Sequence, residues 1–571
     1  MATAQGASLD RKKLLADPIM VSTIVVLVTF LALFILYPLA ILLVDSFVSD
    51  QGGITLDVFK KVLAKPDFKK AIVNTLEIGA ITGVLSTLIG LLFAYVEEYV
   101  QLRTKFMSGL FKVVSILPVV SPPFVLSLSM ILLFGRSGII SKTLLGIQDS
   151  NIYGMRSIIL IQTMTFFPVC YMMLRGLLKN IDPSLEEAAR DMGASRWTVF
   201  TTVTFPLLLP GLGNAFLVTV MESIADFANP MMIGGNIDTL ATAIYMQITG
   251  NFDKKGAAAM AVVLLSITFV MFFVQKYILE AKATATLSGK ASRQRMLITD
   301  ASVRIPLTIM CSAIAIIVIA MYVCVPYGSV ITTWGRNYTL TNKWYLKVFN
   351  NYRGADAFTD SFIMAFIASP ITSLLSMIIS YLVVKKKFAL RGFIEFTSML
   401  AMAVPGTVLG VGFVRGYSNG LFHTGILQWL YGTAALLIIV FVVRSLPTGT
   451  RAGISALRQI DKSIEESAYD MGANSFQVFM TVTLPLIKDS FLSGLVTAFV
   501  RSITAISAVI LVVNPKILLI TVQINEYANR GEYAVACAFS TILILITYTA
   551  VLGMNIFIKY FGTSKAQAEE A

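Results

Sequence analysis

Residues 181–211, IDPSLEEAARDMGASRWTVFTTVTFPLLLPG, return 279 positions later as residues 460–490, IDKSIEESAYDMGANSFQVFMTVTLPLIKDS, with no gap between the copies. Asp182-Pro183-Ser184 combines a capping side chain with a proline in the first turn, which predicts the start of a helix. Ser184 with Glu187, and Ser463 with Glu466, also fit a capping box. Each copy therefore predicts a short helix on a loop, and the repeat predicts a chain built from two matching halves.

The composition places this loop in a membrane protein. Apolar residues make up 56% of the 571 residues and charged residues only 13%, which leaves too little polar surface to cover a water-soluble globule. Apolar runs of about 20 residues recur along the chain, and each is long enough to cross a bilayer as a helix. The four cysteines have no paired spacing, so neither a disulfide framework nor a zinc site is indicated. We expect an all-α integral membrane protein.

Hydropathy predicts twelve spans, six in each half. They lie near residues 19–47, 71–98, 107–134, 153–178, 204–228 and 258–280, and near 303–332, 360–384, 390–415, 433–452, 484–513 and 534–560. The third span contains Pro118, Pro122 and Pro123, so it is a candidate for a broken helix. An even number of spans per half predicts parallel repeats related by a pseudo-twofold axis along the membrane normal.

The loops predict the orientation and the domain boundaries. Lys and Arg are more numerous on the side that carries both termini and both repeated loops, which predicts cytoplasmic N- and C-termini. The net charge of +13 is then mainly a topology signal, and it does not indicate nucleic acid as a partner. We expect a first half over 1–280, a basic cytoplasmic tether over 281–304 and a second half over 305–571. The repeated loops occupy about 182–200 and 461–479.

The repeated loop resembles the EAA loop of type I ABC importer permeases. Glu187-Ala188-Ala189, Gly193 and Val203-x-Phe205-Pro206 match that loop in residue type and spacing, and the second copy differs by one serine for alanine. The resemblance implies a fused, two-half permease whose two loops form coupling helices docked on ATPase subunits. The residues that it assigns to coupling are Glu186, Glu187, Ala188, Ala189, Gly193, Glu465, Glu466, Ser467, Ala468 and Gly472.

The same resemblance implies the partners and the location. The sequence has no P-loop, so the chain is expected not to be an enzyme and to carry no cofactor itself. Two copies of an ABC ATPase subunit would bind ATP and Mg²⁺, and a periplasmic or lipid-anchored binding protein would deliver substrate. Lysines and aromatic residues between Val58 and Lys70 fit a docking site for that protein or, equally, a solvated interfacial helix. The resemblance places the chain among the lipids of the bacterial inner membrane.

A second resemblance concerns the substrate. Residues 222–227, ESIADF, with Asn229-Pro230 and Gly234-Gly235-Asn236, are similar to the fifth span of fused ferric-iron (Fbp-type) permeases, and so are residues 501–508, RSITAISA. This resemblance implies import of ferric iron by alternating access. Related fused permeases are associated with phosphonate or sugar-phosphate uptake, so a small anion stays open as an alternative, and no metal ligands are assigned.

Glu222 and Arg501 occupy equivalent positions in the two halves, 279 residues apart. Both are predicted mid-span, where a charge costs roughly 2.5–3.5 kcal/mol and seldom faces lipid. Asp226 is expected one helical turn beyond Glu222 on the same face. We hypothesise that the three groups meet near the pseudo-twofold axis and line or gate the pathway. A buried Glu222–Arg501 pair that only locks the halves together is the structural alternative.

Two other classes of protein are weaker alternatives. A twelve-span secondary transporter also has two parallel halves, but it needs no repeated loops. Its major-facilitator form carries a loop marked by Gly and Asp/Arg that residues 97–106, EEYVQLRTKF, lack. A membrane enzyme would need a catalytic cluster or a metal-ligand spacing, and the sequence offers neither.

Overall fold

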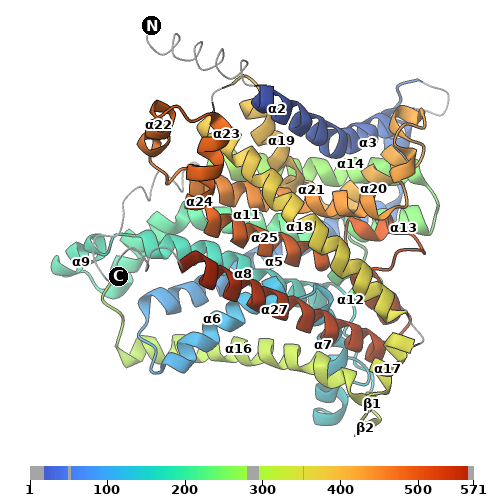
Figure 1. The fold of residues 1–571 in the computed structure, drawn as a ribbon. Coiled ribbons are helices and arrows are strands. Elements are labelled where there is room, and N and C mark those ends of the chain that lie inside the picture. Colours follow the sequence, from blue (N-terminus) through green and yellow to red (C-terminus); the bar gives the residue numbers. More distant parts are fainter. Residues whose placement is uncertain (1–17, 49–52, 280–294, 351–352, 387, 564–571) are drawn as a thin grey trace.

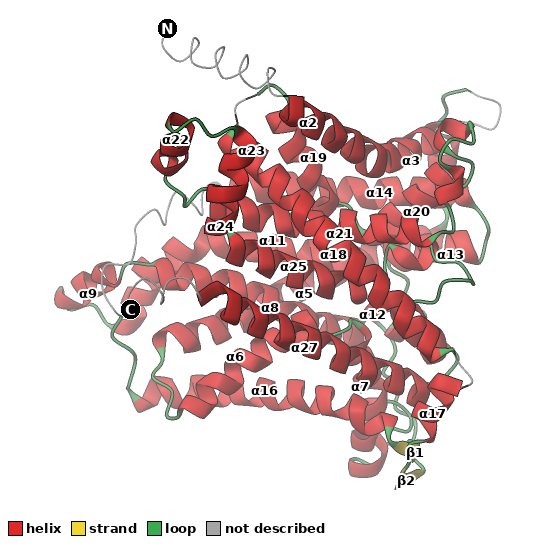
Figure 2. Cartoon of the chain, viewed as in Figure 1, coloured by secondary structure: helices red, strands yellow, loops and turns green. Residues whose placement is uncertain are grey.

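A computed structural model describes residues 18–48, 53–279, 295–350, 353–386 and 388–563 of the chain. Figures 1 and 2 show an almost entirely helical molecule, with one small hairpin formed by strands β1 (Ile331–Thr333) and β2 (Asn337–Leu340). The basic N-terminal run and most of the expected tether lie outside the described residues. The all-α prediction is confirmed.

The first half contains helices of every length from a single turn to a full span. In chain order they are α2 (Pro18–Leu31), η1 (Ala32–Leu36), α3 (Tyr37–Phe47), α4 (Asp57–Ala64), α5 (Pro66–Tyr99), α6 (Lys105–Val120), α7 (Phe124–Phe134), η2 (Ile139–Leu144), α8 (Met155–Asn180), α9 (Pro183–Asp191), α10 (Arg196–Val199), η3 (Phe200–Thr204), α11 (Phe205–Ala225), α12 (Ala228–Ile233), α13 (Leu240–Thr249), α14 (Lys254–Phe273) and η4 (Val274–Leu279).

The second half repeats this order after the hairpin is set aside. Its helices are α16 (Ala301–Ser329), α17 (Lys343–Asn350), α18 (Gly354–Lys385), α19 (Arg391–Ala403), α20 (Gly406–Tyr417), η5 (Leu421–His423), η6 (Gln428–Leu430), α21 (Ala434–Leu457), α22 (Lys462–Asp470), α23 (Ser475–Val478), η7 (Phe479–Thr483), α24 (Leu484–Leu486), α25 (Lys488–Ile503), η8 (Val509–Leu511), α26 (Ile520–Asn529) and α27 (Tyr533–Thr563).

The described residues contain ten helices that are long and apolar enough to span a membrane, or up to twelve when two bent helix pairs are counted. In the first half the third span is broken, because α6 ends at Val120 and α7 begins after Pro122 and Pro123. The prediction of a break at these prolines is confirmed. Proline removes a backbone donor and pushes the preceding residue out of the helical region, so the chain turns there.

Two spans that hydropathy predicts as continuous are bent. The segment 390–415 consists of α19 and α20, which meet at an angle of 110°, and Val404 before Pro405 is extended. The segment 484–513 is bent by 77° before α25, which ends at Ile503. Hydropathy counts apolar residues and does not register direction, so the predicted ranges did not reveal these two bends.

Each half is organised around three tightly packed spans. In the first half α5, α8 and α11 contact one another along their lengths, and in the second half α18, α21 and α25 do the same. Small side chains and hydroxyls line these contacts: Ser376 donates to the carbonyl of Leu446 and Ser380 to that of Thr450. Without a hydrophobic driving force between helices in lipid, such close packing and hydrogen bonding hold spans together.

The first span of each half packs on the other half. α3 and α14 contact α20, while α16 and α27 contact α7. Arg415 of α20 forms an ion pair with Asp45 of α3, and Trp334, just after β1, donates to the carbonyl of Leu132 in α7 at 2.8 Å. The two halves are therefore interlocked in both directions.

Glycines allow α20 to approach its neighbours closely. A Cβ at Gly410 would lie 2.7 Å from the carbonyl oxygen of Ala508, and one at Gly412 would lie 2.7 Å from that of Pro38. Spacings of small residues along a span are the usual means of such approach in membranes. α20 thus contacts both the first span of the first half, at Pro38, and the segment that follows the fifth span of the second half, at Ala508.

Figure 1 places α9 and α22 at one end of the molecule and α12, α13 and α17 at the other. The start of α2 and the end of α27 point toward the end that carries α9 and α22. The two repeated loops thus lie together at one end, away from the short helices that follow the fifth spans.

Candidate functional site

The two repeated loops form matching capped helices, α9 and α22. The Asp182 side chain accepts a hydrogen bond from the backbone N–H of Ser184 at 3.0 Å, and Asp461 accepts one from Ser463 at 3.0 Å. The helices therefore begin at Pro183 and Lys462 with aspartate as the N-cap, and the predicted capping boxes that start at Ser184 and Ser463 are wrong. Asp182, and not Ser184, is the N-cap because Pro183 fits the first helical position.

Glycine ends both helices. The backbone φ is +87° at Gly193 and +88° at Gly472, a left-handed conformation that side chains disfavour. The N–H of Gly193 bonds to the carbonyl of Arg190 at 2.8 Å, and that of Gly472 bonds to Tyr469 at 2.9 Å. These glycines turn the chain from the short helix toward the fifth span.

Glu186 fastens the first loop to the membrane core. Its side chain is 4% exposed. It accepts hydrogen bonds from Tyr99 at 2.7 Å and from Thr204 at 2.6 Å. Arg295 pairs with it at 3.3 Å, and the same guanidinium donates to the carbonyl of Ile181 at 2.9 Å. Glu186 thus joins α5, η3 and the segment before α16.

Glu465 does the same in the second loop with a different cation. Thr483 donates to Glu465 at 2.9 Å, as Thr204 does to Glu186. Lys385, at the end of α18, lies 3.4 Å from the carboxylate and donates to the carbonyl of Ile460 at 3.4 Å. The two anchors are equivalent in geometry, although the cation comes from different elements.

The remaining residues that the sequence assigns to coupling lie around these anchors. Ala189 and Ala468 are buried, whereas Ala188, Ser467, Glu466, Gly193 and Gly472 are exposed and Glu187 is half-buried. Within each loop, then, one acidic residue faces inward and the next faces outward. The spacing of the motif alone does not distinguish the two.

An apolar surface on the loops was not predicted from the sequence. Met192 and Met471 are both 83% exposed, and Trp197 and Phe476 are also exposed. These two pairs are equivalent in the repeats, 279 residues apart, so the same apolar surface is presented twice. The duplication of these residues at the loop tips is the signal that could have identified it.

A small polar cavity lies between the two halves. Its volume is about 50 Å³, and it is lined by residues of α11, α19, α21 and α25, among them Glu222 and Arg501. The structure therefore brings this predicted pair to one place, although the two side chains form no ion pair within the described part of the chain. A volume of this size holds one or two waters.

Arg444 also lines this cavity and was missed by the sequence analysis. It donates to the carbonyl of Val404 at 3.0 Å, and that carbonyl lies at the bend between α19 and α20. A lone arginine inside an apolar span is the same signal that singled out Glu222. The cavity thus holds two guanidinium groups and one carboxylate.

Asp226 lies elsewhere. Helix α11 ends at Ala225, and Asp226 has extended backbone angles, so it is not one helical turn beyond Glu222. Its carboxylate accepts hydrogen bonds from Gln162 at 2.9 Å, from Asn229 at 2.8 Å and from the N–H of Ala228 at 3.0 Å. The expected meeting of Asp226 with Glu222 and Arg501 is wrong, because the helix stops first.

Two interlocked halves of spans, each with an anchored helix held beyond the same end, define the class: the membrane subunit of a transporter driven from that end by another protein. The chain belongs to the family of binding-protein-dependent transport system inner membrane components, whose model matches residues 86–282 and 349–565. It is thus a multi-pass inner-membrane permease that works with a substrate-binding protein and a separate ATPase, and it is not itself an enzyme. Family membership excludes the secondary-transporter and enzyme alternatives.

The chain is similar over most of its length to two named permeases. It is 33% identical to the ferric transport system permease protein FbpB of Actinobacillus pleuropneumoniae, over 100% of this chain and 83% of the relative. It is 34% identical to the putative ferric transport system permease protein FbpB 1 of Haemophilus influenzae, over 90% of this chain and 80% of the relative. The molybdenum transport system permease protein ModB of Escherichia coli is 27% identical over 38% of this chain.

Proposed function

We propose that this permease imports ferric iron, which it receives from a periplasmic or lipid-anchored binding protein and releases into the cytoplasm by alternating access. The names of the two ferric permeases support this substrate, since each of these relatives matches at least 90% of the chain. The pair of equivalently anchored helices, α9 and α22, is the observation that carries the mechanism. Two equivalent docking helices are expected to bind two equivalent ATPase subunits.

One ATPase subunit binds each loop, so two copies serve the complex, and ATP and Mg²⁺ lie on those subunits. The exposed Met192 and Trp197 in one loop, and Met471 and Phe476 in the other, supply the apolar contact. The buried Glu186 and Glu465 hold each short helix against its half, so a push on the helix moves the spans behind it. Both termini then lie in the cytoplasm beside the ATPases.

Glu222, Arg444 and Arg501 line the passage between the halves. Charged groups inside a membrane domain seldom face lipid and mark pathways for ions and polar substrates. The cavity spans α11 of one half and α21 and α25 of the other, so it opens or closes when the halves move apart or together. Asp226 accepts hydrogen bonds from the first backbone N–H groups of α12 and is not part of this passage.

A small anion is the second candidate for the substrate. Two arginines and one glutamate give the cavity a net positive charge, and guanidinium groups suit oxyanions. This observation favours a phosphonate or a sugar phosphate, the alternatives that the resemblance to related fused permeases left open. The ferric assignment is preferred because both full-length relatives are named for iron.

Substrate-stimulated ATP hydrolysis tests the proposal. The permease is reconstituted with its ATPase in nanodiscs, and ferric-loaded binding protein is compared with ligand-free, phosphonate-loaded and sugar-phosphate-loaded forms. Stimulation by the ferric form alone is the expected result. Stimulation only by a phosphorylated ligand would support the anion, and failure to co-purify with any ATPase would overturn the coupling role of α9 and α22.

A further inference from the structure

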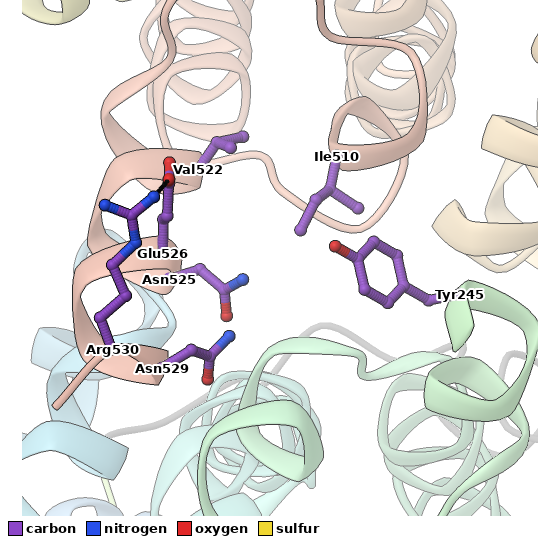
Figure 3. Close-up of a pocket in the computed structure, with 7 residues that line it drawn as sticks. All are labelled: Tyr245, Ile510, Val522, Asn525, Glu526, Asn529 and Arg530. Atoms are coloured by element: carbon purple, nitrogen blue, oxygen red, sulfur yellow. Dashed lines mark hydrogen bonds and ion pairs between the residues drawn. The ribbon is translucent and has the colours of Figure 1, made fainter. Parts of the chain in front are cut away.

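A second, larger cavity lies between the halves at the end of the molecule opposite α9 and α22. Its volume is about 440 Å³. Tyr245 of α13 faces it from the first half, and α26 faces it from the second (Figure 3). Its lining is Tyr245, Ile510, Val522, Asn525, Glu526, Asn529 and Arg530. Cavities of this size accommodate small ligands or hydrated ions.

Equivalent helices of the two halves face this cavity. Helices α13 and α26 are equivalent, since each begins at a residue whose N–H bonds to a hydroxyl of the second span: Leu240 to Thr75 at 2.8 Å and Ile520 to Ser361 at 2.9 Å. Tyr245 and Asn525 are each the sixth residue of their helices, and they lie on opposite sides of the cavity (Figure 3).

Asn525 has an unsatisfied polar atom in this cavity. The residue is 4% exposed, and its Oδ1 atom has no hydrogen-bond partner. Figure 3 shows the amide directed into the space opposite the Tyr245 hydroxyl. A buried polar group without a hydrogen-bond partner costs about 1–3 kcal/mol, so the Asn525 Oδ1 atom would gain from contact with a ligand in this cavity.

The groups around the cavity are oxygen donors. They are the Tyr245 phenol, the amide carbonyls of Asn525 and Asn529, and the Glu526 carboxylate. Oxygen donors of this kind suit hard cations. Arg530 forms an ion pair with Glu526, so a guanidinium group neutralises this carboxylate (Figure 3). An arriving metal ion would take the place of this guanidinium.

The same donor set is too sparse for a resident metal. The described residues contain no group of three His, Cys, Asp or Glu side chains that could hold one. A site in a conduction pathway must bind its ion well enough to admit it and weakly enough to release it. One carboxylate, one phenol and two amides meet that requirement.

We propose that this outer cavity receives the ferric ion, together with its bound water or a small oxygen ligand, through the oxygens of Tyr245, Asn525 and Glu526. This inference rests on the proposed function, because it assigns the site at which that substrate first enters the permease. Binding the ion displaces the phenolic proton of Tyr245 to water, and no electron is transferred.

Optical titration of the permease–ATPase complex in nanodiscs with ferric citrate tests the ligands directly. A phenolate bound to ferric iron gives a visible charge-transfer band. We expect this band in the unmodified complex, its loss in Tyr245→Phe, and its retention in Tyr338→Phe, a control on the exposed strand β2. A band of unchanged intensity in Tyr245→Phe would overturn the assignment of Tyr245.

Substitutions that change the charge of the cavity test whether its ligand is a cation or an anion. Asn525→Asp keeps the shape and adds a negative charge, so it should tighten ferric citrate binding, whereas Glu526→Gln should weaken it roughly tenfold, as expected for loss of one ligand. The opposite pair of results would identify an anion site and overturn the proposal. Because each substitution nearly preserves the shape of the side chain, opposite changes in affinity in the two variants cannot come from misfolding alone.

Failure of this inference is distinguishable from failure of the proposed function. Stimulation of ATP hydrolysis by ferric-loaded binding protein, with no effect of Tyr245→Phe or Glu526→Gln on iron uptake, would leave the function intact and reject the cavity. Absence of stimulation in the unmodified complex would reject the function, while the optical titration would still decide whether the cavity binds ferric ion.

Discussion

Gly193 and Gly472 have the backbone conformation that a side chain tolerates least. A Cβ at either position would meet no atom within 4 Å, so substitution by alanine is opposed by backbone strain alone. We expect Gly193→Ala and Gly472→Ala each to cost about 1–2 kcal/mol in the stability of the loop. The affinity of the permease for its ATPase, measured by titration in nanodiscs, should fall in parallel.

Gly176 in α8 provides the matched control. It also has open space around its Cα, but its backbone is helical. Gly176→Ala should leave ATPase affinity unchanged, because alanine is favoured in a helix. Equal losses at Gly176 and Gly193 would show that the left-handed turn is not what the loop requires.

Glu186 and Glu187 are adjacent in the motif but differ in environment. Glu186→Ala removes the carboxylate that neutralises the buried Arg295, and loss of one member of a buried ion pair costs about 3–5 kcal/mol, whereas Glu187 forms none of these contacts. We expect Glu186→Ala to lower the thermal stability of the purified permease markedly and Glu187→Ala to have little effect on it. A comparable loss of stability in the two variants would contradict the anchoring role of Glu186.

Several residues of the sites could be predicted from the sequence, and others could not. The offset of 279 residues places Glu222 opposite Arg501, and both line one cavity. The position of Asp226 depends on whether α11 continues past Ala225, and a hydropathy run does not contain that information. Tyr245 and Asn525 differ in type, so no motif marks them, and only the fold reveals that they are equivalent.

At the scale of the elements, the loop tips present a repeated apolar surface. Met192→Asp and Met471→Asp each place a charge where an apolar contact with the ATPase is proposed, and the double variant should abolish co-purification with the ATPase. Single variants should weaken it by roughly tenfold, since a central contact residue typically contributes more than 1 kcal/mol. Affinity purification with titrated salt measures this directly.

Leu340→Asp is the control for that experiment. Leu340 is 75% exposed in β2, at the opposite end of the molecule. The same chemical change there should leave ATPase binding intact. If Leu340→Asp disrupts binding as strongly as Met192→Asp, the loss reflects general instability and not contact at the loops.

The two loops differ in how they are held. Beside Glu186, the segment before α16 adds backbone bonds from Ile298 to Tyr99 at 2.7 Å and from Gln101 to Ile298 at 3.0 Å. Arg295 also lies 4.0 Å from the Tyr99 ring. The anchor of the second loop instead uses Lys385 from its own half. The first loop is therefore tied to the chain that begins the second half.

This difference predicts a local response. In Arg295→Ala, amide hydrogen exchange should rise over residues 183–194 and stay unchanged over 462–473. Arg196→Ala, which removes only an exposed pair with Asp300, should alter neither region, because exposed ion pairs contribute about 0–1 kcal/mol. Faster exchange in both loops after Arg295→Ala would indicate that the loops are not held independently.

Elements were predictable where local chemistry decides them. The caps at Asp182 and Asp461 and the break at Pro122-Pro123 follow from residues within a few positions. At the 110° bend, the carbonyl of Val404 accepts a hydrogen bond from Arg444, forty positions away. Such a bend needs a partner from another helix, so a single span was the only prediction that hydropathy could give.

At the scale of the molecule, interlocking joins the halves without help from the tether. Coexpressed fragments 1–280 and 281–571 should therefore assemble into one complex that retains binding to the ATPase. The contacts of α3 and α14 with α20, and of α16 and α27 with α7, supply the interface. Copurification of an affinity-tagged first fragment with the second is the measurement, and independent migration of the two would contradict it.

The pairing of Asp45 with Arg415 has a consequence for biosynthesis. The two residues are 370 positions apart in the chain. At about 5–20 residues per second, synthesis of that length takes roughly 20–70 s. During this interval the first span rests in the bilayer with its carboxylate unmatched and its packing surface uncovered. The incomplete first half must therefore avoid aggregation and degradation until α20 has been synthesised.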